Sequence, residues 1–327
     1  MITVPTTLVL GAGASKPYGF PSGAELRALL SNANNLRGMI GFNESEIQEF
    51  SSVFSRSGMP SIDAFLARRG THKVRSDSWC TFSDIGKAAI AYCLIKNEHP
   101  DRLFSSNLDD HWYQYLWSLI ADSLGSFGEN KLHIITFNYD RSLEFYLLTA
   151  LQSSFGISAA EAAIHLKKIP ILHVYGQLGE LQEAIQARDG RAYSNNVSSA
   201  GPIEVAAAGI RVIDESRDDD AVFEQAYSYL KSAQRIYFLG FGFDETNVRR
   251  LRLDTLVQGI RKDQSEDASF FATTMGLKAA ERNRVIQRLN VKRYPFDNHR
   301  SSENIAEHGD LNSEQYLRTL GVLHSPV

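Results

Sequence analysis

The chain has 327 residues, of which 43% are hydrophobic and 22% are charged, as is ordinary for a globular protein. Its 34 basic and 38 acidic residues give a net charge of −4, which argues against a surface that coats nucleic acid. The two cysteines, Cys80 and Cys93, form no paired motif, which argues against a zinc ribbon or a disulfide framework and suits a reducing cytoplasm. No apolar run approaches the ~20 residues that span a bilayer. We therefore expect a cytoplasmic protein without a membrane segment or a metal site.

Short apolar runs rich in β-branched and aromatic residues predict buried strands. Four runs are strong and two are weaker: residues 6–10, 133–137, 169–174 and 235–239, then 269–273 and 291–294. Segments with helical periodicity lie between them, at 140–151, 219–231 and 246–260. This alternation predicts an α/β fold with a Rossmann-like, mostly parallel sheet and helices on both faces. Ligands of such sheets bind beyond the carboxyl ends of the strands.

Residues 24–130 interrupt the alternation. They contain helical patterns but no convincing strand, with the helices expected at 61–69, 83–96 and 110–124. We interpret them as a helical insertion, or subdomain, after the first strand of a single domain that spans residues 1–327. The segments 183–199 and 297–310 are polar and predict irregular structure.

The first strand runs directly into a turn that is dense in glycine. Glycine lets the backbone approach a phosphate and present its N–H groups, and a serine in the turn can donate its hydroxyl. The dinucleotide fingerprint is not matched, because Lys16 stands where its third glycine belongs. A tight strand-to-helix turn without a ligand is the alternative interpretation. The candidate binding residues are Gly11, Ala12, Gly13, Ser15, Gly19 and Pro21, and Gly23 follows them.

The second strand ends at Thr136 and Phe137, followed by Asn138 and Asp140. An asparagine amide both donates and accepts, so Asn138 is a candidate for orienting a water or a ribose hydroxyl. Asp140 is a candidate for a sugar hydroxyl or for the cap of the next helix. Both are preferred cap residues, and a cap accounts for only one of them.

The third and fourth turns follow the strands at 169–174 and 235–239. His173 is a candidate general base near neutral pH, and a hydrogen-bonded structural histidine is the alternative. Glycines in both turns would let a ribose or adenine lie against the strand ends. The remaining candidates for nucleotide binding are Thr136, Tyr175, Gly176, Gly240, Gly242, Phe243 and Asn247.

Read in order, the four turns resemble the sirtuin-like, or silent information regulator, superfamily over roughly residues 5–260. The first turn resembles that family's Gly-Ala-Gly-x-Ser…Gly-x-Pro-x-Gly loop, and residues 136–140 match its Thr-x-Asn-x-Asp motif. Residues 173–176 are similar to the family's catalytic histidine segment, and 240–244 to its adenosine-contacting turn.

Two departures from the family narrow what the resemblance implies. Tyr175 stands where the deacylases have histidine before glycine, and His173 lies two residues earlier, on the same face of a strand. The chain also lacks the deacylases' two cysteine pairs for zinc. It is therefore more similar to the zinc-free bacterial effectors of antiphage defence that hydrolyse NAD. The segment 61–66, Ser-Ile-Asp-Ala-Phe-Leu, also resembles that branch.

The resemblance implies that NAD is the substrate and that its nicotinamide–ribose bond is cleaved by water. Asn138 would position the water, His173 would take its proton, and Asp140 would bind the sugar or fix the turn. Control by a homo-oligomer or by a DNA-translocating ATPase of the same defence system is implied as well.

Three other functions are compatible with the same turns. One is a module that senses NAD or ADP-ribose without turnover. Another is an NAD-dependent deacylase or ADP-ribosyltransferase. A dehydrogenase fits less well, since no strand precedes the acids Glu44 and Glu46.

Overall fold

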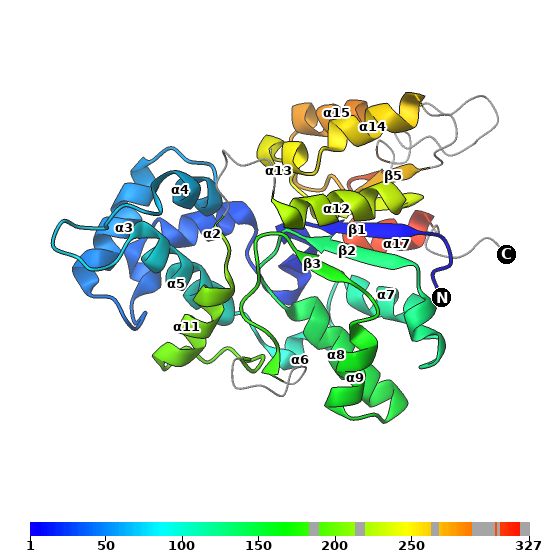
Figure 1. Cartoon of the computed structure of the whole chain (residues 1–327), viewed down its shortest axis with the longest axis horizontal. Helices are drawn as coiled ribbons and strands as arrows, with labels where there is room; N and C mark the ends of the chain where they lie inside the picture. The colour runs from blue at the N-terminus through cyan, green and yellow to red at the C-terminus, as the bar shows by residue number, and fades with distance from the viewer. Residues whose placement is uncertain (183–189, 213–219, 263–267, 290–304, 306–307, 321–327) are drawn as a thin grey trace.

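A computed structural model describes residues 1–182, 190–212, 220–262, 268–289, 305 and 308–320 (Figure 1). Its five parallel strands are β1 (Thr6–Leu10), β2 (Leu132–Thr136), β3 (Ile171–His173), β4 (Arg235–Leu239) and β5 (Ser269–Ala272). They form one sheet in the order β3-β2-β1-β4-β5. The predicted α/β, Rossmann-like fold is confirmed. The strand expected at 291–294 lies outside the described residues.

Helices cover both faces of the sheet (Figure 1). On one side lie α7 (Trp112–Ile120), α8 (Ser142–Phe155) and α9 (Ala159–Leu166), and α12 (Ala221–Ser232) lies on the other. The ring of His133 in β2 stacks on Tyr229 of α12, with centroids 4.2 Å apart. On the opposite side, the hydroxyls of Tyr113 and Ser142 join α7 to α8 at 2.7 Å.

A second group of helices, which we call the helical lobe, stands beside the sheet (Figure 1). It comprises α2 (Gly23–Leu30), α3 (Glu44–Arg56), α4 (Ile62–Arg69), α5 (Phe82–Ile95) and α11 (Ala200–Gly209). The buried rings of Phe50, Phe54, Phe65 and Phe82 form its centre. Residues 24–130 contain no strand, as expected. They do not all belong to the lobe, however, because α7 packs under the sheet, and α11 enters the lobe from beyond β3.

The helices of the lobe begin at residues that cap them. The side chains of Ser22, Asn43 and Thr81 each accept a hydrogen bond from the backbone N–H three residues later. The acid at that later position accepts one in turn from the backbone N–H of the cap residue. These capping boxes satisfy N–H groups that the first turn of a helix leaves unpaired. Local sequence therefore fixes where these helices start.

The single helix expected at 246–260 is wrong, because the chain forms α13 (Glu245–Arg250) and α14 (Leu253–Lys262) instead. Arg252 separates them with φ of 50°, in the left-handed region. Leu251 and Leu253 are both fully buried, and two residues so spaced on one helix would point to different sides. The break lets both leucines reach the core.

The remaining helices are short or lie near the carboxyl end of the chain. They are α1 (Ala12–Ser15), η1 (Lys16–Tyr18), η2 (Ala33–Leu36), α6 (Pro100–Leu103), η3 (Ser126–Glu129), α15 (Ala279–Arg288) and α17 (Ser313–Leu320). None of the described helices combines the length and apolar character needed to cross a bilayer. Of the two segments expected to be irregular, residues 183–189 and most of 297–310 lie outside the described part.

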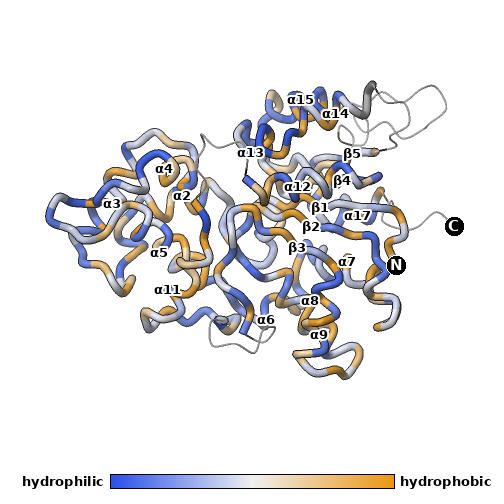
Figure 2. The backbone as a smooth tube through the Cα atoms, viewed as in Figure 1, coloured by the Kyte–Doolittle hydropathy of each residue, from blue (hydrophilic) through white to orange (hydrophobic). Residues whose placement is uncertain are grey.

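Hydrophobic residues run along the central strands, while the surrounding helices mix both kinds (Figure 2). Every residue of β1 is buried. The register aligns the strand ends: Leu10 lies opposite Thr136 and Leu239, and Thr136 lies opposite His173. The turns that follow β1, β2, β3 and β4 therefore meet at one edge of the sheet.

Candidate functional site

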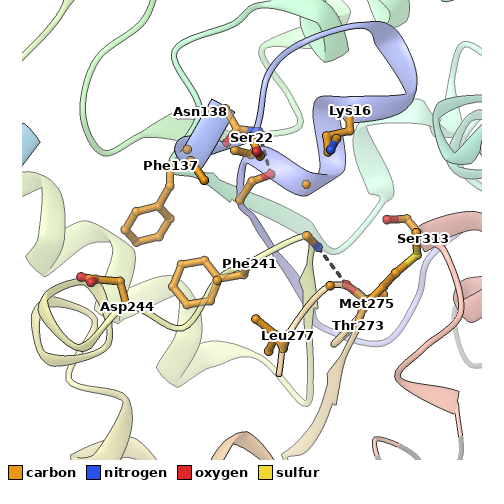
Figure 3. A pocket seen from close by; sticks show the side chains of 18 of the residues that line it. Lys16, Ser22, Phe137, Asn138, Phe241, Asp244, Thr273, Met275, Leu277 and Ser313 are labelled. Atoms are coloured by element: carbon orange, nitrogen blue, oxygen red, sulfur yellow. Dashed lines mark hydrogen bonds between the residues drawn. The ribbon is translucent and has the colours of Figure 1, made fainter. Parts of the chain in front are cut away.

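A cavity of about 1140 Å³ opens at this edge of the sheet. Its walls come from the turns after all five strands, from the start of α4 in the helical lobe, and from residues 311–313. Figure 3 shows Asn138 and Ser22 on one side of it, and Asp244, Thr273 and Met275 on the other. The cavity thus lies where the strand order of the sheet reverses, between β1 and β4, as ligand sites of such sheets do.

Three of the predicted glycines hold two turns together. Gly13 N–H donates to Gly240 O at 3.0 Å, and Gly11 N–H donates to Leu239 O at 3.0 Å. A Cβ on Gly240, where φ is +58°, would lie 2.1 Å from Ala14 N, and one on Gly11 would lie 2.5 Å from Gly240 O. The glycines are therefore needed for contact between backbones, although all three also line the cavity.

Gly242 has a different role from those three. A Cβ there would meet no atom within 4 Å, and the residue lines the cavity. Within the described part of the chain, the backbone N–H groups of Phe241 and Gly242 donate to no acceptor. Ala12 lines the cavity from the opposite turn. This is the part of the site where a ligand can approach backbone donors closely.

Asn138 lines the cavity and is almost fully buried. Its Nδ2 donates to Gly11 O and to Ser15 Oγ, each at 3.0 Å. Because a carbonyl only accepts, these partners fix the amide orientation. No described residue donates to Asn138 Oδ1. That oxygen is an oriented acceptor for a ligand.

A buried network supports the Asn138 side chain without reaching the cavity. Ser15 Oγ, which accepts from the Asn138 amide, lies close enough to Asp140 and Tyr113 to lower the pKa of both side chains. Asp140 accepts from Ser142 N at 3.1 Å and from the Ser142 hydroxyl, which places it at the start of α8. Burial raises the pKa of Asp140, against the hydrogen bonds of Ser142 and Ser15. Ser15 and Asp140 thus fix the turn, and neither lines the cavity.

His173 lies beside Asn138 but binds its backbone. Its Nδ1 is 2.9 Å from Asn138 O, and its Nε2 bonds the Glu144 carboxylate. Burial opposes protonation, yet Glu144 and Asn138 O raise the pKa of His173 above its ordinary value. A ring that donates from both nitrogens has no lone pair for a proton. In this geometry His173 holds the turn that carries Asn138. Its role as a general base stays a prediction.

Tyr175 lines the cavity, as predicted. Its hydroxyl donates to Asn247 Oδ1 at 2.6 Å and accepts from Arg250 Nη1 at 2.8 Å. Asp244 caps α13 beside them through Thr246 N at 2.9 Å. The third and fourth turns are thus joined by polar side chains at one end of the cavity.

Five other predicted residues do not line the cavity, and the structure gives four of them a local role. Gly19 ends η1 in the left-handed region, and Gly176 packs on Gly209. Thr136 Oγ1 accepts from Asn138 N at 3.1 Å, and Phe243 packs on Phe238 and Phe241. Pro21 is the fifth of these residues.

Several lining residues escaped sequence reasoning. They are Lys16 and Arg102, Arg250 on α13, and Asp63 at the start of α4. Asp63 accepts a hydrogen bond from Tyr139, the residue after Asn138. Burial raises the pKa of Asp63 against that hydrogen bond. The resemblance of segment 61–66 was the available signal for Asp63, and for Arg250 it was the helical spacing of three from Asn247.

Neither a metal site among the described residues nor a similar known protein points to the function of this cavity. In the ranges that the structure describes, no three His, Cys, Asp or Glu side chains gather as a metal site would need. Comparison of the sequence with models of protein families and with curated proteins finds no match.

Proposed function

We propose that this protein is an NAD glycohydrolase, which transfers the ribose of NAD from nicotinamide to water. The observation that carries the proposal is the Asn138 amide. Gly11 O and Ser15 Oγ fix its nitrogen, while its oxygen is left for a ligand of the cavity. An oriented acceptor at that point suits a ribose hydroxyl or the attacking water.

The rest of the cavity suits the rest of a dinucleotide. Its volume of about 1140 Å³ is slightly above that of typical ligand pockets, roughly 300–1000 Å³, so a ligand as large as a dinucleotide has room. The N–H groups of Phe241 and Gly242 suit a pyrophosphate, and Lys16 and Arg102 bring positive charge to the same cavity. Binding energy from these contacts would hold the nicotinamide ribose at Asn138.

The reaction depends more on the alignment of ribose and water than on acid–base catalysis. The C1′–N bond breaks with its electron pair going to nicotinamide, and positive charge moves from the pyridinium ring to the ribose. Water adds to C1′ and releases a proton to solvent, so the products are nicotinamide, ADP-ribose and a proton. Asn138 orients the water or the ribose, and His173 keeps the Asn138 turn in place.

The test is to incubate the purified chain with NAD and quantify nicotinamide and ADP-ribose. Asn138→Ala should lower turnover at least about 100-fold, because alignment is lost, while NAD binding and the fold are kept. Asn283→Ala, at an exposed position of α15, is the matched control. Normal turnover by Asn138→Ala would overturn the assignment.

The same assay separates the other candidates. Tight NAD binding without any product would indicate a sensing module. Transfer of ADP-ribose to a protein, or loss of an acyl group from a peptide, would indicate a transferase or a deacylase. A requirement for a reductant would indicate hydride transfer.

The order of the four turns, which resembles that of sirtuin-like antiphage effectors, supports a place in bacterial defence. Unregulated loss of NAD is toxic, so activity would be controlled by a homo-oligomer or by a partner DNA-translocating ATPase. Size measurements with turnover assays, with and without an ATPase encoded nearby, test this control. A monomer that is fully active alone would contradict it.

A further inference from the structure

Four of the five residues in the loop after β2, residues 138–141, are held by different segments of the chain. Asn138 donates to Gly11 and Ser15 in the turn after β1, and Asp140 accepts from Ser142 at the start of α8. Tyr139 and Arg141 bond to carboxylates of the insertion that separates β1 from β2, and Arg141 also donates to backbone carbonyls at 179–180 and 191–192. The loop that carries Asn138 is therefore held from two directions.

The insertion holds this loop through two carboxylates. Glu98, which follows α5, pairs with Arg141 at 3.0 Å, and both side chains are almost fully buried. Asp63, on the first turn of α4, accepts a hydrogen bond from the buried hydroxyl of Tyr139. Hydrogen bonds to a charged carboxylate are stronger than neutral ones.

The two carboxylates differ in their access to the ligand. Asp63 lines the cavity, as do its neighbours Ser61 and Ala64, whereas Glu98 does not. Two charged residues that face Asp63 also lie close enough to affect its pKa: Arg250 of α13 lowers it, and Asp244, which caps α13, raises it. A shift of α4 would therefore move Tyr139, which is next to Asn138.

We propose that Asp63 is a positioning residue, through which the helical lobe sets the Asn138 loop by way of the Tyr139 hydroxyl. The inference rests on the proposed NAD hydrolysis for its effect on turnover. It adds to that function a route by which a partner bound to the lobe would control activity, since movement of α4 would displace the loop.

The main experiment compares Asp63→Ala, Asp63→Asn and Tyr139→Phe in NAD hydrolysis. Asp63→Ala and Tyr139→Phe should each lower kcat by about 10- to 100-fold with little change in KM, because displacements near 1 Å cost up to about 100-fold. Asp63→Asn should restore most of the loss, since an amide oxygen still accepts from Tyr139. The double variant Asp63→Ala/Tyr139→Phe should lose no more than either single variant.

Glu44→Ala is the matched control, because Glu44 is exposed on the first turn of α3 in the same lobe. It should leave both kinetic constants unchanged. If Asp63→Asn were as inactive as Asp63→Ala while Tyr139→Phe kept full activity, Asp63 would act on the substrate by its charge, and the proposal would be overturned.

Hydrogen–deuterium exchange of the loop supplies a readout that does not depend on turnover. Amides of residues 138–142 should exchange faster in Asp63→Ala and Tyr139→Phe than in the native chain and in Glu44→Ala. Unchanged exchange would overturn the positioning role. A native chain that fails to hydrolyse NAD would refute the proposed function alone, since faster exchange would still show that Asp63 holds the loop.

Discussion

The turns after β1 and β4 and the loop after β2 face the same cavity, but different interactions hold them. The two turns are joined by backbone contacts that require glycine at positions 11, 13 and 240. The loop is held by buried side chains that carry charge or hydroxyl groups, among them Glu98 and His173. Steric change should therefore disturb the turns, whereas changes of charge and of pH should disturb the loop.

The largest loss of stability is expected when Arg141 of the loop loses Glu98, its buried charged partner. Glu98→Ala would leave Arg141 and Arg191 buried without their carboxylate, which typically costs about 3–5 kcal/mol. Chemical denaturation measures the change in unfolding free energy. Glu224→Ala, which removes an exposed partner of Arg252, should cost no more than about 1 kcal/mol. Equal effects of the two variants would mean that the buried charges do not hold the loop.

A smaller effect, about 2–4 kcal/mol, is expected from Gly240→Ala. The new Cβ would lie 2.1 Å from Ala14 N, at a residue whose φ of +58° is strained for alanine. Gly242→Ala is the control, because its Cβ would meet no atom and its φ is not left-handed. Thermal unfolding should separate the two variants. If both were equally stable, backbone contact between the turns would not account for Gly240.

The smallest effect, on the order of 1 kcal/mol, concerns pH and the His173–Glu144 pair. The folded pKa of His173 lies above its unfolded value of about 6.5, so protonated His173 adds stability in full below about pH 6.5. That contribution is lost as the pH rises through the raised pKa. Unfolding titrations should show the advantage over Glu144→Gln shrinking as the pH rises above 6.5. A constant difference would contradict the charged pair.

Features set by local interactions could be predicted from the sequence, and features set by contacts between distant residues could not. Strands β1 and β4 have the predicted bounds, because continuous apolar runs report burial on both faces of a parallel sheet. The helix expected at 246–260 was wrong, because the break at Arg252 depends on where the core lies. Asp63 and Tyr139 are 76 residues apart, and no local pattern indicates that they meet.

By itself, the sequence determined the parallel sheet and placed Asn138 at a strand end, because apolar periodicity and turn residues act locally. Only the tertiary structure decided which side chains face the cavity. It turned His173 toward Asn138 O and Glu144, brought Tyr175 to the cavity wall, and set Asp63 of the lobe against Tyr139. The reason is physical: a side chain's partners depend on which distant segments the fold packs against it.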